Sequence, residues 1–377
     1  MRVGGDWLTN DRTQTVLGLL TGAGYAAYAV GGCVRNAALG EAVTDVDIAT
    51  SARPETVMAL AEAAGLRAVP TGLAHGTVTL VVGGEGFEVT TFRRDVATDG
   101  RHAEVAFSDQ MSDDAARRDF TMNALYADAT GHVLDPLGGL DDLKARRLRF
   151  VGDAAQRIAE DYLRILRFFR FHAQYGDPLG GLDADGLAAC AAGVDGLARL
   201  SSERVTSELR KLLGARDPSP SVAAMHHAGV LARVLPGADP RALAPLVHLE
   251  AGRAPHWMRR LAVLAPDTAP LRLTKAEARD LSRLRDAVGD MTPPAVLGYG
   301  LGAELGADAV LARAAVLESP LPPDWRAEVT RGASARFPIR AADLPGLEGA
   351  ALGQELKALE ARWIASDFRA TRADLLG

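Results

Sequence analysis

Hydrophobic positions in the first third of the chain alternate between helical and strand-like spacing. Gln14–Gly22 and Pro54–Ala64 carry apolar residues at helical spacing, and the second begins with proline in its first turn. Tyr25–Val30 is a short apolar segment that runs into a Gly31–Gly32 turn, and Val34–Leu39 is again helix-like. The pattern predicts mixed α and β structure.

Two further strand patterns follow, separated by glycines. Thr77–Val82 and Gly86–Thr91 are rich in β-forming residues and flank Gly83–Gly84, which predicts a hairpin. Val46–Ala49 is expected to be a short strand that carries two carboxylates. Arg93–Gln110 is polar and lacks apolar periodicity, so we expect a mobile loop there.

The second half of the chain has a different character. Strand patterns fade after Leu134–Leu140, and from Leu143 onward the spacing is almost entirely helical. Glycine and proline clusters divide this part into groups of helices. The expected fold class is α+β, with a mixed head followed by an all-helical remainder.

Composition narrows the class of protein. The 377 residues are 48% hydrophobic, enough for a sizeable core, and no stretch approaches the roughly 20 apolar residues of a membrane span. Two cysteines are too few for a disulfide framework, and the N-terminus lacks the pattern of a secretory signal. These features predict a cytoplasmic protein.

The net charge of −6 argues against a uniformly basic nucleic-acid-binding surface but allows a local one. Lys275, Arg279 and Arg283 recur at a spacing of four and would form a basic stripe on one helix face. A solvated helix face explains that stripe equally well.

The first chemical motif combines a glycine turn with paired carboxylates. Gly31-Gly32 and Arg35 are followed about ten residues later by Asp45 and Asp47. Carboxylates at i and i+2 on a strand share a face, and such a pair can hold two Mg²⁺ ions about 3.5–4 Å apart. The turn would offer N–H groups to a triphosphate, whose charge Arg35 would neutralise. The alternative is a solvated strand face after a glycine turn.

Two other segments add candidate groups. Glu88 lies between apolar neighbours in the second β-rich run and could face the same ions from an adjacent strand. Arg117, Arg118, Asp119 and Asn123 offer donors for phosphate and acceptors for ribose hydroxyls. Singly, Glu88 could be a surface residue, and Asp119 could simply cap a helix.

A third motif places charges along one predicted helix. Asp161, Arg164, Arg167 and Arg170 are three residues apart and would form one polar ridge, opposite Leu163, Leu166 and Phe169 in the core. A carboxylate beside a guanidinium can read the Watson–Crick edge of a base. A surface ion pair is the alternative, but the arginines outnumber the matching acids in the sequence around them.

Together these motifs resemble the class II tRNA nucleotidyltransferases, which share a polymerase-β-like head with bacterial poly(A) polymerases. The resemblance covers residues 25–213 and is carried by GGCVRNAALGEAVTDVDIAT, FEVTTFRRD, DGRHAEVAF, RRDFTMNAL, DPLGGLDDLKARRLRFVGD and EDYLRILRFFRF. It implies a nucleotidyltransferase head at 1–140, a helical neck with a nucleotide-reading helix at 141–214, and a helical body and tail at 215–377 that binds tRNA.

The resemblance also implies roles for individual residues. Asp45 and Asp47 match the metal-binding pair, with Glu88 as a third catalytic carboxylate. The nucleotide-binding positions are Gly32, Arg35, Arg118, Asp161, Arg164, Arg167 and Arg170. Asp161 and Arg164 match the residues that act as a protein template, and Asp99-Gly100-Arg101 lies in a loop associated with the switch from CTP to ATP. Asn36 departs from the family, which usually has Asp there.

The function implied is template-independent addition or repair of the 3′-terminal CCA of tRNA, with release of pyrophosphate. The partners would be the tRNA 3′ end, CTP, ATP and Mg²⁺, with no membrane and no inferable stable protein partner. A poly(A) polymerase of the same superfamily and a non-catalytic RNA-binding protein are the alternatives.

Overall fold

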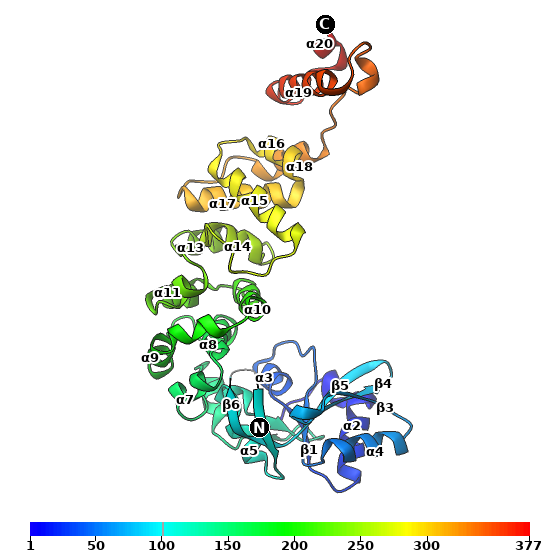
Figure 1. Ribbon diagram of the computed structural model, residues 1–377, viewed down its shortest axis with the longest axis vertical. Coiled ribbons are helices and arrows are strands. Elements are labelled where there is room, and N and C mark those ends of the chain that lie inside the picture. The colour runs from blue at the N-terminus through cyan, green and yellow to red at the C-terminus, as the bar shows by residue number, and fades with distance from the viewer. Residues whose placement is uncertain (100–101) are drawn as a thin grey trace. The chain divides into compact units, whose positions relative to one another are not determined.

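The computed structural model describes residues 1–99 and 102–377, and it divides into two compact units, Met1–Val234 and Leu235–Gly377 (Figure 1). The predicted division at residues 140 and 214 stays a prediction, since the first unit contains both the head and the first group of helices.

The first unit contains all the strands of a seven-stranded sheet in the order β3-β4-β5-β2-β1-β8-β9. The strands are β1 (Ala27–Val30), β2 (Ile48–Thr50), β3 (Arg67–Gly72), β4 (Thr77–Val82), β5 (Glu85–Thr91), β8 (Tyr126–Ala127) and β9 (Val133–Leu134). Only β2 and β5 pair in parallel; the other pairs are antiparallel. The predicted hairpin at β4–β5 is confirmed, with positive φ at Gly83 and Gly84.

Helices cover the sheet and form the rest of this unit. They are α1 (Asp6–Thr9), α2 (Asp11–Gly22), α3 (Gly32–Leu39), α4 (Pro54–Ala63), α5 (Met111–Ala116), α6 (Gly139–Lys144), α7 (Ala154–Glu160), α8 (Leu163–Tyr175), α9 (Ala184–Ala192), α10 (Ser202–Leu213), α11 (Ser219–His227) and α12 (Val230–Val234), with the 3₁₀ turns η1 (Leu73–His75), η2 (Thr121–Asn123) and η3 (Val194–Arg199). Helices α2 and α4 bury Val16, Leu20 and Val57 against β4 and β5 (Figure 1). The helices predicted at 14–22, 34–39 and 54–64 are thereby confirmed.

The expected loop at Arg93–Gln110 is wrong over most of its length. β6 (Arg93–Asp99) and β7 (His102–Phe107) form an antiparallel ribbon, followed by a short connection to α5. The segment is polar over most of its length, and the short alternation of Ala103, Val105 and Phe107 within it was too brief to predict a strand. Gly100 and Arg101 of the predicted tip lie outside the described residues.

The strand expected at Val46–Ala49 begins later than predicted. β2 starts at Ile48, so Asp45 and Asp47 lie in an extended segment just before the strand rather than on it. The Asp47 carbonyl still accepts a hydrogen bond from the Val30 N–H at 2.9 Å, which fixes the end of this segment against β1.

The second unit is helical throughout, as the sequence predicted. It comprises α13 (Leu243–Leu249), α14 (Trp257–Leu264), α15 (Lys275–Gly289), α16 (Pro294–Leu301), α17 (Ala303–Val316), α18 (Trp325–Ser334), η4 (Ala341–Asp343), α19 (Gly349–Ala365) and α20 (Arg372–Leu376). α16 and α18 approach closely because each carries a glycine, Gly298 or Gly332, that lies against the backbone of the other helix. A Cβ on Gly332 would lie 1.7 Å from the Ala295 carbonyl oxygen. None of the described helices combines the length and apolarity that crossing a bilayer requires.

Candidate functional site

Three carboxylates lie on or next to the two central strands β2 and β5 of the head sheet. The parallel register pairs Ile48 of β2 with Val89 of β5, so the residues just before them, Asp47 and Glu88, are neighbours on the exposed face. Burial raises the pKa of Asp47, and the negative charges of Glu88 and Asp45 raise it further against the opposing effect of Arg118. The structure therefore places Glu88 and Asp45, which the sequence singled out with Asp47, near enough to Asp47 for their charges to raise its pKa.

This arrangement fits a hard divalent cation. All the donors are carboxylate oxygens, which Mg²⁺ prefers. The pKa of Asp47 is raised first by burial and then by the negative charges of Glu88 and Asp45, which a bound cation would offset. Across the described part of the chain, no three His, Cys, Asp or Glu side chains stand close enough to hold a metal by themselves. Mg²⁺ commonly binds through one or two carboxylates together with waters and substrate phosphates, so an incomplete protein cage suits it.

The glycine turn lies directly beside an arginine. Gly31 has φ 72°, a left-handed conformation that favours glycine, and an added Cβ would come within 3.2 Å of the Arg118 Nη1. α3 begins at Gly32, so the first-turn N–H groups of that helix lie next to the Arg118 guanidinium. This places the predicted turn and Arg118 at one location.

Arg118 is held firmly in this position. Its Nη2 donates to Asp114 at 2.9 Å and its Nε to the Tyr126 hydroxyl at 3.2 Å, while its charge also lowers the pKa of Asp47. Burial alone would raise the pKa of Asp114, but Arg118 and Arg117 bring it below its usual range. Arg118 is therefore a fixed positive charge beside the carboxylates.

The Arg35 side chain forms its hydrogen bonds with residues other than the three carboxylates. Its guanidinium is buried and donates to Asn36, Asn123 and the Tyr175 hydroxyl, the last at 2.8 Å, and it lies 4.0 Å from the Tyr175 ring centroid. These contacts connect α3 to the end of α8. Neutralisation of a triphosphate by Arg35 stays a prediction.

The predicted ridge on α8 needs correction. Asp161 precedes the helix and accepts from Arg204 of α10 at 2.6 Å, whereas Arg164 donates to Glu160 at 2.5 Å. Arg167 donates to Asp119, and Arg170 to Glu208 at 2.5 Å. The expectation of arginines without matching acids is wrong, because the acids come from α7, from the segment before η2 and from α10.

Tertiary packing therefore adds residues that sequence reasoning missed. Arg204 and Glu208 are four residues apart on α10, so both reach α8 from one helix face. Glu208 is only 5% exposed, although it occupies a charged position in an amphipathic helix. A charge among the apolar positions Val205, Leu209 and Leu212 was the signal that could have identified it.

Asp119 is the most strongly shifted carboxyl of this region. Burial would raise its pKa, but Arg167 and the Asn123 amide hold the pKa at about 2. Asp119 also accepts from the Phe120 N–H at 2.9 Å and from the Arg167 guanidinium. The capping alternative is wrong for η2, because Phe120 occupies the N-cap position and no side chain caps that turn.

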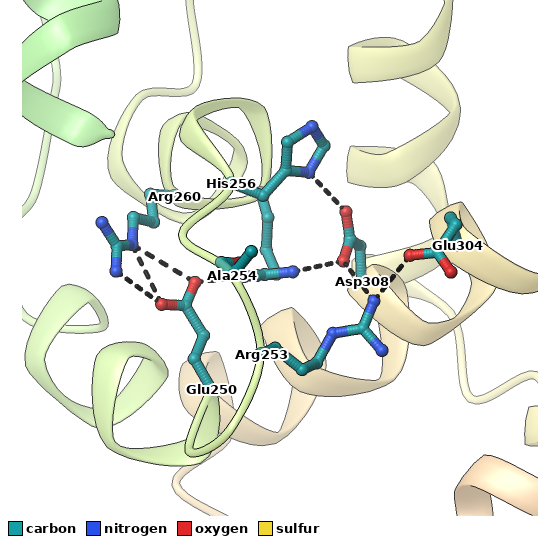
Figure 2. A network of polar contacts seen from close by, with 8 residues as sticks. Glu250, Arg253, Ala254, His256, Arg260, Glu304 and Asp308 are labelled. Carbon is teal, nitrogen blue, oxygen red and sulfur yellow. Dashed lines mark hydrogen bonds and ion pairs between the residues drawn. The ribbon is translucent and has the colours of Figure 1, made fainter. Parts of the chain in front are cut away.

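A separate charged network lies in the second unit (Figure 2). Arg259 donates to both Glu250 and Asp308, at 2.7 and 2.6 Å, and Arg260 donates to Glu250 at 2.7 Å. His256 is 2.6 Å from Asp308.

In the predicted basic stripe on α15, Arg283 donates to the Gly300 carbonyl and Arg279 contacts Asp280. These arginines therefore have structural partners within the unit.

The comparisons with known proteins point to one family. Residues 27–149 match the family described as "Poly A polymerase head domain", and residues 182–241 match "Probable RNA and SrmB- binding site of polymerase A". The human "CCA tRNA nucleotidyltransferase 1, mitochondrial" is 46% identical over 184 residues, 48% of this chain and 42% of that protein. The "CCA-adding enzyme" of Oceanobacillus iheyensis is 41% identical over 213 residues, 56% of this chain and 52% of that protein. The aligned region thus spans about half the length of these curated relatives.

Solved structures extend the similarity over nearly the whole chain. The Bacillus stearothermophilus CCA-adding enzyme in complex with CTP is 30% identical, with a TM-score of 0.75 over 94% of this chain and 93% of that one. The Thermotoga maritima CCA-adding enzyme complexed with tRNA shares the fold at 18% identity, with a TM-score of 0.69. The chain belongs to the family of the CCA-adding enzymes, nucleotidyltransferases that use a divalent metal and have a polymerase-β-like head followed by helices.

Proposed function

We propose that this protein adds or repairs the 3′-terminal CCA of tRNA, using CTP and ATP and releasing pyrophosphate. The observation that carries the proposal is the group of three carboxylates, Asp45, Asp47 and Glu88, beside the Gly31–Gly32 turn and Arg118. Family membership and the CCA-adding names of the relatives support it.

The residues divide the work of nucleotidyl transfer. Asp45 and Asp47 would hold Mg²⁺, with Glu88 beside them; when bound, Mg²⁺ would activate the tRNA 3′-hydroxyl and neutralise the triphosphate. Arg118 and the first-turn N–H groups of α3 would bind and orient the phosphates.

Base selection would rest on Asp161 and Arg164. Cytosine and adenine both present an amino donor beside a ring-nitrogen acceptor, matching a carboxylate and a guanidinium. Asp161 is paired with Arg204 and Arg164 with Glu160, so these partners would set the orientation of the two side chains before a base arrives. Arg35, Arg167 and Arg170 would complete the nucleotide-binding wall through their contacts along α8.

The helical part of the chain would bind the tRNA. The match of residues 182–241 to a probable RNA-binding region supports this assignment.

Cytoplasmic location stays a prediction, since the relatives include mitochondrial enzymes. Poly(A) polymerase activity is the second candidate, favoured by the head-domain match, which the two activities share.

The test is incubation with a tRNA that lacks its CCA end, supplying CTP and ATP separately and together with Mg²⁺. The proposed activity predicts two cytidines with CTP alone and a complete CCA with both nucleotides. Long adenosine tails with ATP alone would identify a poly(A) polymerase, and RNA binding without incorporation would identify a non-catalytic protein.

A further inference from the structure

The side chain of Asn36 joins two parts of the head. Its Oδ1 accepts hydrogen bonds from Arg35 Nε at 3.1 Å and Nη2 at 2.8 Å, and its Nδ2 donates to the Ala42 carbonyl at 2.9 Å. The Asn36 backbone carbonyl also accepts from the Glu41 N–H at 2.8 Å. The amide offers this acceptor and donor together; an aspartate could keep the contacts with Arg35 but, when ionised, could not donate to Ala42.

The segment that Asn36 holds carries Asp45. α3 ends at Leu39, Gly40 turns the chain with φ 73°, and residues 41–47 have no regular structure before β2. At the far end, the Val30 N–H fixes the Asp47 carbonyl to the sheet. Asp47 is therefore placed by the sheet, whereas Asp45 lies in the span between that anchor and the Asn36 contacts at Glu41 and Ala42.

We propose that Asn36 is a positioning residue for Asp45, holding residues 41–42 so that the Asp45 carboxylate stays beside Asp47. The inference rests on the proposed function, in which the two aspartates hold a divalent cation. Asn36 acts through Asp45 and does not itself touch substrate. Its contacts with Arg35 extend the support to Tyr175 at the end of α8.

The first test measures backbone hydrogen exchange in the metal-free, full-length protein. Asn36→Asp keeps the acceptor for Arg35 and removes the donor to Ala42, while Asn36→Leu removes both. Both variants lose the hydrogen bond to Ala42, and this loss predicts about two- to tenfold faster exchange over residues 41–46 in each of them. Wild-type exchange in Asn36→Asp would show that Ala42 is not held by the amide and would overturn the proposal.

Asn10→Asp is the matched control. Asn10 also donates from Nδ2 to a backbone carbonyl, that of Asp6 at 2.8 Å, but at the start of α2. The Asn10→Asp substitution makes the same chemical change in the same unit but away from residues 41–46. Exchange over residues 41–46 should therefore stay at the wild-type rate. Faster exchange there in Asn10→Asp would mean general loosening and would count against the proposal.

The second test measures Mn²⁺ binding by electron paramagnetic resonance, since Mn²⁺ accepts the same oxygen ligands. Asn36→Leu adds no charge, and we expect it to raise the Mn²⁺ concentration for half-saturation by about two- to tenfold. Unchanged affinity would overturn the positioning role. Asp45→Ala separates the two failures: binding that does not depend on Asp45 would remove the proposed metal site itself, whatever Asn36 does.

Discussion

At the scale of single residues, position relative to the sheet decides what each carboxylate can do. Asp47 and Glu88 are neighbours because β2 and β5 run in parallel, and burial together with the negative charge of Glu88 raises the pKa of Asp47. Asp45 belongs to the same group through the chain segment that precedes β2. Substitutions at these positions should therefore affect catalysis far more than folding.

Asp45→Ala or Asp47→Ala should reduce incorporation of both C and A by at least about a hundredfold, because a metal contributes several kcal/mol of charge stabilisation in the transition state. Single-turnover incorporation with CTP and with ATP measures this loss. Asp141→Ala, an exposed carboxylate on α6, is the control and should keep wild-type rates. Near-normal turnover of either variant at ordinary Mg²⁺ would refute the metal assignment.

Asp161→Ala should relax base selection. Uracil and guanine place a carbonyl where cytosine and adenine carry an amino group, so an aspartate there excludes them by about 1–3 kcal/mol, or roughly ten- to a hundredfold. The variant should admit UTP or GTP and use CTP and ATP more slowly, as measured with each of the four triphosphates. Wild-type selectivity in Asp161→Ala would place base choice elsewhere.

At the scale of elements, buried ion pairs fix α8 against its neighbours. Arg170 and Glu208 are 7% and 5% exposed, so the ion pair that joins α8 to α10 is largely shielded from water. Asp161 and Arg204 form a second connection between the start of α8 and α10. The orientation of the nucleotide-reading region thus depends on α10 as well as on α8 itself.

Glu208→Ala should destabilise the first unit by about 3–5 kcal/mol, because it leaves the Arg170 charge buried without its partner. Urea denaturation measures the loss. The double variant Arg170→Met with Glu208→Leu should recover much of it, since apolar residues fill the site without an unpaired charge. If the double variant lost as much free energy of unfolding as the two single variants together, the unpaired charge would not be the cause of the loss.

The β6–β7 ribbon is the second element with a specific expectation. Removing residues 99–101 should impair A addition more than C addition, because this region is associated in the family with the switch from CTP to ATP. Products should then end in CC, as read from tRNA sequencing gels after incubation with both nucleotides. Equal loss of both activities would indicate a role in folding instead.

At the scale of the whole molecule, several carboxylates share one dependence on pH. Asp114, Asp119, Asp142 and Asp308 all have pKa values below the usual range, in each case because arginine contacts and hydrogen bonds outweigh burial. A depressed folded-state pKa contributes stability that is present above the unfolded value and is lost as pH falls. Asp47, with a raised pKa, acts in the opposite direction.

Stability should therefore fall steeply as the pH is lowered from about 4 towards 2. For Asp119, the difference between the ordinary aspartate pKa of 3.8 and a pKa of about 2 corresponds to about 2 kcal/mol at neutral pH. Urea denaturation at a series of pH values measures the effect. Asp119→Asn should be less stable at pH 7 and lose less stability on acidification; an unchanged pH slope would contradict the role of Asp119.

The sequence by itself determined the local elements, and it predicts which residues form the candidate site. Helical spacing at 14–22 and 54–64, the Gly83–Gly84 hairpin and the all-helical second half were predictable because periodicity reports which face is buried. Asp45, Asp47 and Glu88 were predictable as a group because their residue types and order suit metal-dependent phosphoryl transfer.

Only the tertiary structure decided how the charges are paired. The partners of Asp161, Arg167 and Arg170 lie 43, 48 and 38 residues away along the chain, and local spacing carries no information about such contacts. The polar composition of residues 93–110 likewise did not reveal the β6–β7 ribbon, whose strands pair in antiparallel register. The periodicity of apolar residues within a segment shows which of its positions are buried. Charge pairing between elements depends instead on which helices the fold brings together.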